Sequence, residues 1–331
     1  MSPVIWAIAF AVSAVVCGLM VVIGPRDEPD GKRKTQERPV PSGGGVGIAV
    51  GALAAMVAGN MFVLPGVYTP WLSILAAGLI FLALGFLDDC FDLDARLKTG
   101  LLGALSLITV GVGWWLFASF ADEVPTGVVI SAVLVLGGAL WLFVFTNAAN
   151  FMDGSNGLSL GAMAIMLVAL AVMSQNTLGL VAAVFGFLVW NMTGRLYAGD
   201  SGALFVGFLV AALGLLGAFA GVYSIWIPPL IGLPFIADVL LTLIWRARKG
   251  RKLMHAHNEH AYHLLKRAGW GHWPVALLYW GLTAACCTLA IWAMFGPTHV
   301  QLVTFWSAAA VVSALWIWQR MVYWPRVSVT G

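Results

Sequence analysis

The chain has 331 residues, of which 61% are hydrophobic and 9% are charged, and its formal net charge is +3. Soluble domains carry roughly 25% charged residues, so this composition excludes a soluble globular protein. The small net charge gives no indication of a nucleic-acid partner. We therefore expect an all-α polytopic membrane protein in which residues 1-331 form a single integral membrane domain.

Apolar segments recur along the whole chain, and most are long enough to cross a hydrocarbon core of about 30 Å. Backbone groups in lipid must be satisfied within each segment, which favours helices. The runs are continuous, whereas the strands of a transmembrane barrel would alternate in polarity. The sequence predicts about eleven transmembrane helices, at roughly residues 2-23, 43-63, 70-87, 99-119, 126-146, 157-174, 178-193, 202-220, 223-245, 273-295 and 299-319.

The distribution of Lys and Arg predicts the orientation of these helices. With eleven spans, all 17 Lys and Arg residues fall in the loops or the tail on one face. Cytoplasmic loops are enriched in basic residues, so we expect this face to be cytoplasmic, with the N-terminus outside and the C-terminus in the cytoplasm. Four polar segments lie on the same face, at residues 85-98, 147-157, 194-208 and 255-267.

The segment "FLDD" ends an apolar run and places Asp88 beside Asp89, with Asp92 about one turn further on. Residues three and four apart share a face at a helix end. Adjacent carboxylates repel each other, and a divalent cation or a bound cationic group would relieve this repulsion. The alternative is an ordinary solvated helix end.

The segment "NAANFMDGSNGL" places Asn147, Asn150 and Asp153 at intervals of three residues, and thus on one side of a helical turn. Amide and carboxylate oxygens are suitable ligands for Mg²⁺. Gly154 and Gly157 would allow a ligand to approach the backbone closely. The alternative is a helix-capping turn, because Asn, Asp and Gly favour helix ends.

Asp200 in "AGDSG" precedes an apolar helix, where it could serve as an N-cap. The same geometry has a functional interpretation, since the free N–H groups at a helix N-terminus bind phosphate. Both interpretations remain open from the sequence.

The segment 255-267 contains His255, His257, His260 and His263 among basic residues. It has neither the HExxH spacing of a zinc site nor a nearby cysteine. Phosphate binding by hydrogen bonds and charge is therefore favoured. An ordinary basic cytoplasmic loop would explain the Lys and Arg residues but not the histidines.

Asp238 lies inside a predicted helix, with Thr242 one turn further along the same face. A carboxylate at membrane depth is costly and is expected to have a partner. We interpret Asp238 as structural, for example as the acceptor of a hydrogen bond between helices.

Five motifs in order resemble those of the polyprenyl-phosphate N-acetylhexosamine-1-phosphate transferase superfamily, glycosyltransferase family 4. They are "RPVPSGGG" at 38-45, "FLDD" at 86-89, "NAANFMDGSNGL" at 147-158, "GDSG" at 199-202 and "HNEHAYH" at 257-263. The last is similar to the "HxxHAY" form of the bacterial members that initiate O-antigen synthesis. Such enzymes transfer N-acetylhexosamine 1-phosphate from a UDP-sugar to a lipid phosphate and release UMP.

The resemblance implies a catalytic role for three carboxylates and a Mg²⁺ site, with Mn²⁺ as a substitute. Asp88 and Asp89 would lie near the lipid phosphate, and Asp153 matches a further acidic position proposed to be catalytic. Asp200, with help from Asn150, would bind the metal.

The resemblance also implies five substrate-binding residues. Lys98 would contact the pyrophosphate, and Gly154 and Asn156 would lie at the uracil site. His257 and His260 would belong to a loop that closes over the sugar phosphate.

Two residues depart from the pattern of the family. Asn156 replaces the second aspartate of the "DGxDGL" form, and an amide can still form a hydrogen bond with uracil. His263 replaces the usual glutamine of the "HxxHAY" members, which bears on the choice of sugar.

The implied acceptor is undecaprenyl phosphate, and the implied location is the cytoplasmic face of the bacterial inner membrane, where the product would initiate a cell-surface polysaccharide. A phosphate monoester is mostly dianionic at pH 7, so direct attack by the lipid phosphate is favoured over a covalent aspartyl-phosphate intermediate. A homodimer is one candidate assembly. The alternative function is a polytopic transporter or lipid-carrier flippase, which would place polar groups at mid-membrane.

Overall fold

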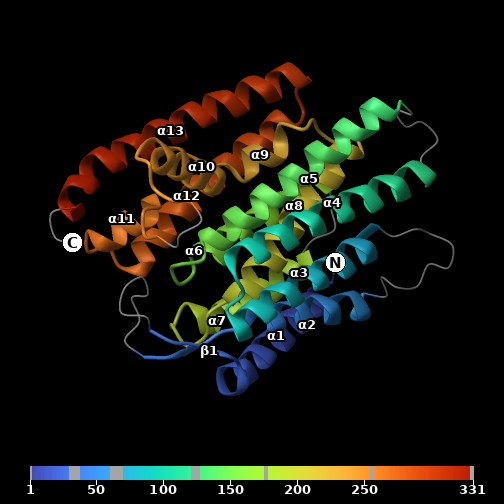
Figure 1. Cartoon of the computed structure of the whole chain (residues 1–331). Coiled ribbons are helices and arrows are strands. Elements are labelled where there is room, and N and C mark those ends of the chain that lie inside the picture. The colour runs from blue at the N-terminus through green and yellow to red at the C-terminus, as the bar shows by residue number, and fades with distance from the viewer. Residues whose placement is uncertain are drawn as a thin grey trace.

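The computed structural model describes residues 2–29, 38–59, 70–120, 127–174, 178–253 and 257–328. Within these ranges the chain is helical apart from one two-stranded hairpin and the connecting loops (Figure 1). The helices are α1 (Pro3–Ile23), α2 (Gly44–Ala58), α3 (Pro70–Phe91), α4 (Ala95–Phe120), α5 (Val128–Phe151), α6 (Leu158–Ser174), α7 (Leu178–Asn191), α8 (Gly199–Phe219), α9 (Ile227–Ile231), α10 (Leu233–Arg248), α11 (Ala261–Arg267), α12 (His272–Ala293) and α13 (Thr298–Ser328). The all-α prediction is confirmed.

Seven helices in the described ranges are long and apolar enough to cross a membrane, namely those at Pro3–Ile23, Leu72–Phe91, Ala95–Ser119, Val128–Phe151, Gly199–Phe219, His272–Ala293 and Thr298–Pro325. These helices indicate an integral membrane protein. The apolar helices α2, α6 and α7 are shorter, with 15, 17 and 14 residues. The number eleven and the orientation of the termini therefore stay predictions.

The segment expected as a single helix at 223-245 is instead broken in two. The short helix α9 ends at Ile231, and α10 begins at Leu233 after Gly232. Proline cannot donate the backbone hydrogen bond that continues a helix, and three prolines fall in the first half of this segment, namely Pro228, Pro229 and Pro234. The prediction of one continuous span was wrong here.

Helix α8 lies at the centre of the bundle, against α2, α3 and α5. Its apolar window is 72% buried, whereas the windows of the other six candidate spans are 17% to 39% buried. Small residues allow this close packing: a Cβ at Gly45 of α2 would overlap the backbone of Gly202 in α8. This close packing holds the N-terminal turn of α8 against the N-terminal turn of α2.

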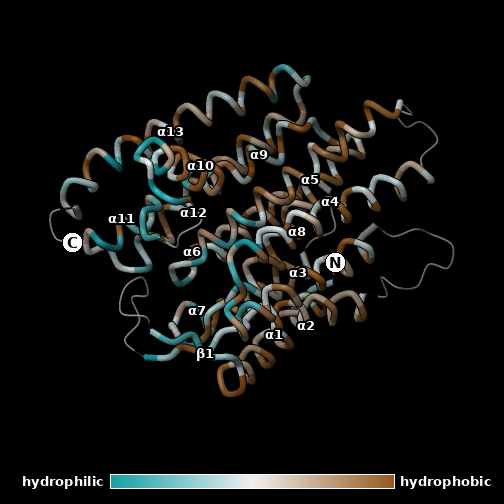
Figure 2. Tube along the Cα trace, viewed as in Figure 1, coloured by the Kyte–Doolittle hydropathy of each residue, from teal (hydrophilic) through white to brown (hydrophobic). Residues whose placement is uncertain are grey.

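The motif at 38-45 fixes the chain just before α8. Strand β1 (Arg26–Asp27) pairs in antiparallel with β2 (Val40–Pro41). The Tyr197 N–H donates to the Pro41 carbonyl at 2.9 Å, and the Gly44 N–H donates to the Tyr197 carbonyl at 3.1 Å. Hydrophilic residues concentrate near β1 and α11, while the helices that lead away from them are mainly hydrophobic (Figure 2).

Candidate active site

The carboxylate of Asp89 on α3 caps the first turn of α8. It accepts hydrogen bonds from the backbone N–H groups of Asp200 (2.8 Å) and Ser201 (3.2 Å). Gly199 has a φ of +67°, and a Cβ there would overlap the Asp89 carboxylate. Only glycine adopts this conformation readily, so the "GDSG" sequence brings α8 directly against α3.

Asp200 is not the N-cap residue of α8, which begins at Gly199. Its side chain instead forms an ion pair with Lys98. With its amide oriented to match its neighbours, Asn150 donates to Asp200 Oδ1 at 2.9 Å and accepts from Lys98 Nζ at 3.0 Å. The structure therefore brings together the two predicted metal ligands, which come from the end of α5 and the start of α8.

Lys98 reaches this cluster from the first turn of α4. Its Nζ lies 2.9 Å from Asp88 Oδ2, while Asp88 Oδ1 accepts from the Leu93 N–H at 2.9 Å. The tight connection between α3 and α4 depends on Asp92, which adopts a φ of +50°, a conformation that aspartate tolerates better than most residues. Asp88 and Lys98 are thus held face to face.

The acidic cluster, defined here as Asp88, Asp89 and Asp200 with Lys98 and Asn150, has more negative than positive charge. Three carboxylates face one ammonium group, so with all four groups ionised a formal charge of −2 remains. The side chains of Asp88, Lys98 and Asp200 are 13%, 16% and 25% exposed, which leaves the cluster open to a ligand. Within the described ranges, no three His, Cys, Asp or Glu side chains are arranged to hold a metal by themselves.

Asp153 lies next to this cluster, in the turn that follows α5. Burial raises the pKa of its carboxyl group well above the usual value, and the negative charge of Asp89 raises it further. A raised pKa favours the protonated form, which would be a hydrogen-bond donor rather than a metal ligand. The side-chain amide of Asn147 donates to the Phe143 carbonyl at 2.8 Å, one turn earlier in α5.

The turn at residues 153–157 is held by residues that the sequence did not single out. The Tyr262 hydroxyl donates to the Phe151 carbonyl at 3.0 Å, and a Cβ at Gly154 would overlap that hydroxyl. The Asn156 N–H donates to His272 Nδ1 at 3.2 Å. Gly154 and Asn156, both predicted at the uracil site, therefore lie against the histidine segment and the start of α12.

The two predicted substrate-binding histidines have different surroundings. His260 is buried and stacks on Phe151, with ring centroids 5.9 Å apart. His257 is partly exposed, and burial lowers its pKa to about 4, with a further contribution from His260. His257 is therefore neutral at pH 7, while His255 lies outside the described residues.

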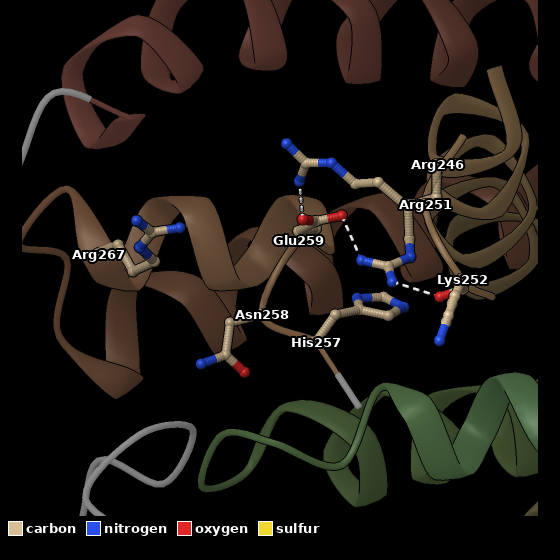
Figure 3. A pocket seen from close by; sticks show the side chains of 7 residues that line it. All are labelled: Arg246, Arg251, Lys252, His257, Asn258, Glu259 and Arg267. Carbon is tan, nitrogen blue, oxygen red and sulfur yellow. Dashed lines mark hydrogen bonds and ion pairs between the residues drawn. The ribbon is translucent and has the colours of Figure 1, made fainter. Parts of the chain in front are cut away.

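His257 lines a cavity of about 470 Å³ together with six other residues (Figure 3), namely Arg246, Arg251, Lys252, Asn258, Glu259 and Arg267. Glu259 forms ion pairs with Arg246 (2.6 Å) and with Arg251. The wall of the cavity is basic, which suits an anionic ligand. His260, although close to His257 in sequence, is not among the lining residues.

Asp238 has the structural surroundings expected of it. It accepts hydrogen bonds from the Ala261 N–H (2.8 Å), the Tyr279 hydroxyl (2.6 Å) and the Thr242 hydroxyl (3.3 Å). Ala261 is the first residue of α11 and Tyr279 lies on α12. One buried carboxylate thus ties α10 to the helix that carries the histidine segment and to a membrane helix.

The fold and the cluster define a helical membrane protein with an oxygen-rich charged site at its helix ends, and comparison with known proteins identifies its family. Residues 71–218 match the family described as Glycosyl transferase family 4. A Bacillus subtilis protein named probable undecaprenyl-phosphate N-acetylglucosaminyl 1-phosphate transferase is 30% identical over 79% of this chain and 75% of its own length. The chain belongs to this family, the polyprenyl-phosphate hexosamine 1-phosphate transferases, and is a phosphotransferase.

Two other relatives bear names from the same family. The phospho-N-acetylmuramoyl-pentapeptide-transferase of Listeria welshimeri is 29% identical over 64% of this chain and 71% of its own length. The decaprenyl-phosphate N-acetylglucosaminephosphotransferase of Mycobacterium leprae is 28% identical over 75% of this chain and 71% of its own length. Two of the three names specify a polyprenyl phosphate and N-acetylglucosamine. The third specifies phospho-N-acetylmuramoyl-pentapeptide instead.

Proposed function

We propose that the protein transfers N-acetylhexosamine 1-phosphate from a UDP-sugar to undecaprenyl phosphate. The products would be undecaprenyl-pyrophosphate-sugar and UMP. The observation that carries this proposal is the meeting of Asp88, Lys98, Asn150 and Asp200 at the ends of α3, α4, α5 and α8. Phosphoryl transfer between two anions depends on positioning and on charge neutralisation, and this cluster can supply both.

The proposed cofactor is Mg²⁺, with Mn²⁺ as a substitute, and Asp200 and Asn150 are its proposed ligands. Carboxylate and amide oxygens are suitable donors for a hard cation. Asp88 and Asp200 both contact the Lys98 ammonium, which supports the proposal that this cluster binds a cation. When bound, the metal would neutralise the pyrophosphate of the donor and orient it for attack.

The remaining roles follow from the surroundings of each side chain. Asp88 would position the lipid phosphate or the metal, while Asp89 holds the first turn of α8. Asp153, with its raised pKa, would donate a hydrogen bond to an anionic substrate. Lys98 would contact the pyrophosphate, and His257 in its basic cavity would bind phosphate in its neutral form.

The lipid phosphate would attack the donor directly, because it is already mostly dianionic at pH 7 and needs no strong base. Gly154 and Asn156 would lie at the uracil, and His260 would support the loop that carries His257. Incubation with radiolabelled donor in the absence of lipid acceptor tests the direct route. Label trapped on the protein would support a covalent intermediate instead.

We propose the cytoplasmic face of the bacterial inner membrane as the location, since all 17 Lys and Arg residues fall on one predicted face. The UDP-sugar would arrive from the cytoplasm while the isoprenoid tail stays in the bilayer. The product would initiate a cell-surface polysaccharide, and the "HNEHAYH" motif supports O-antigen among the candidates. A homodimer is the assembly we would test first.

The sugar is best identified by a direct assay. Purified protein would be incubated with undecaprenyl phosphate and Mg²⁺ across a panel of UDP-N-acetylhexosamines that includes N-acetylglucosamine and the 6-deoxy sugars. Release of UMP that requires both lipid and metal would establish the reaction and name the donor. No release with any donor from folded protein would contradict the proposed pairing of a UDP-N-acetylhexosamine with undecaprenyl phosphate.

A further inference from the structure

The ammonium of Lys98 lies among three oxygen atoms that come from three different helices. It contacts Asp88 Oδ2 at 2.9 Å, Asp200 Oδ2, and the Asn150 side-chain oxygen at 3.0 Å. These atoms belong to α3, α8 and α5, and Lys98 itself belongs to α4. A single cationic group therefore occupies the centre of the acidic cluster.

The other oxygens of the cluster are committed elsewhere. Both oxygens of Asp89 accept backbone N–H groups, at 2.8 and 3.2 Å. Asp88 Oδ1 accepts from the Leu93 N–H, and Asp200 Oδ1 accepts from the Asn150 amide. The three oxygens that hold the Lys98 ammonium take part in none of these bonds, which makes them the best placed of the cluster to bind a divalent cation.

We propose that Lys98 is an internal counter-ion that a divalent metal must displace, and that metal loading releases its ammonium toward the substrate phosphates. This inference rests on the proposed function, because it takes the metal site at Asp200 and Asn150 as given. Two cations cannot share these oxygens without strong repulsion. Displacement therefore couples two events, the filling of the metal site and the delivery of Lys98.

The position of Lys98 suits such a movement. Its backbone is fixed in the first turn of α4, where the Lys98 N–H donates to the Asp94 carbonyl at 2.9 Å. Its side chain is a flexible four-carbon stem ending in a compact charge, and it is 16% exposed. The ammonium can therefore leave the cluster without any change in the helix.

The test is a Mn²⁺ titration of the full-length protein in detergent without substrates, followed by electron paramagnetic resonance. Lys98→Met removes the competing charge, so Mn²⁺ should bind at least about tenfold more tightly than in the wild type, given the strength of charge interactions near a protein surface. Lys98→Arg keeps the charge and should bind Mn²⁺ much as the wild type does. Equal or weaker Mn²⁺ binding by Lys98→Met would overturn the inference.

Asp200→Asn separates this inference from the proposed function. If Asp200→Asn abolishes Mn²⁺ binding while Lys98→Met does not strengthen it, only the counter-ion inference fails. If the wild type and Lys98→Met both fail to bind Mn²⁺, the metal site of the proposed function fails, and the inference fails with it.

A measurement on the wild type alone covers the case in which Lys98→Met does not fold. Reductive dimethylation of lysines, read by mass spectrometry, would report the accessibility of the Lys98 amine. Mg²⁺ should accelerate the modification of Lys98 and leave that of Lys249, an exposed residue at the end of α10, unchanged. A Lys98 rate that Mg²⁺ leaves unchanged or lowers would contradict displacement.

Discussion

The Asp89 carboxylate on α3 accepts a hydrogen bond from the backbone N–H of Asp200 at 2.8 Å and thereby fixes the first turn of α8. The second oxygen of Asp89 accepts from the next N–H, that of Ser201, at 3.2 Å. Through these two bonds Asp89 determines where the Asp200 side chain meets Lys98 and Asn150. The proposed metal ligand is therefore positioned by a residue from another helix.

Asp89→Asn should weaken this cap. An amide offers one acceptor oxygen and turns its NH₂ group toward a backbone N–H, so at least one hydrogen bond is lost, at a cost of about 1 to 3 kcal/mol. We expect a lower denaturation temperature and a loss of UMP release, because Asp200 is displaced. Asp89→Asn with wild-type stability and wild-type Mn²⁺ affinity would contradict the capping role.

Gly154→Ala should disrupt the contact between the turn at 153–157 and the histidine segment. The added Cβ would overlap the Tyr262 hydroxyl, so we expect weaker binding of the UDP-sugar, seen as a higher KM. Tyr262→Phe removes the overlapping oxygen. In the double variant part of the lost UDP-sugar binding should therefore return, because the effects of residues in contact are not additive. Gly100→Ala on α4, where a Cβ meets nothing within 4 Å, is the matched control.

Tyr279→Phe should loosen the start of α11. It removes the hydroxyl that donates to Asp238 at 2.6 Å, and losing a buried hydrogen bond to a charged acceptor costs about 1.5 to 3 kcal/mol. Hydrogen exchange should become faster at Ala261 and Tyr262, whose N–H groups face the same carboxylate. In the control Tyr223→Phe, which removes a bond to the Gly214 carbonyl, exchange in α11 should be unchanged.

Acid should destabilise the protein through histidines whose pKa is lowered in the folded state. The pKa of His263 is lowered from 6.5 to about 3, mainly by burial. The neighbouring cations and histidines, His260, Lys266 and His257, also lower this pKa, while Asp238 raises it. The unfolded chain binds a proton at His263 below pH 6.5 whereas the folded chain does not, so stability falls as the pH drops. Between pH 6.5 and 5 the loss is about 2 kcal/mol.

The matched variant for this effect is His263→Gln. It should show a smaller fall in denaturation temperature between pH 7 and 5 than the wild type. His257, whose pKa is lowered to about 4, contributes in the same direction and leaves a residual slope. An identical pH profile for wild type and His263→Gln would contradict the assignment of a neutral His263 in the folded protein.

Much of the candidate site could be predicted from the sequence, because its residues fall at the ends of apolar runs. Asp88, Asn150 and Asp200 each stand where a membrane helix starts or stops, and the structure places them together with Lys98. The Asp89 cap could not be predicted in this way, since 111 residues separate it from Asp200. Such a contact depends on how α3 and α8 pack.

The errors of the sequence interpretation have physical causes. The break at Gly232 was indicated by Pro228, Pro229 and Pro234, but the average hydrophobicity of the segment masked it. The sequence did not indicate that Tyr262 and His272 contact this site. A tyrosine beside histidines and a histidine between tryptophans form no motif with a characteristic spacing. Their roles become visible only when the turn at 153–157 packs against α11 and α12.

The most direct test of the central claim compares two aspartates near the same helix ends, one inside the acidic cluster and one outside it. Asp94 accepts from the Arg96 N–H at 2.9 Å and is exposed, and asparagine is an equally good cap residue, so Asp94→Asn should keep wild-type UMP release. Asp200→Asn should lower UMP release at least about a hundredfold, as expected when several kcal/mol of charge stabilisation are lost. Equal UMP release by both variants, at equal amounts of folded protein, would contradict our assignment of the active site.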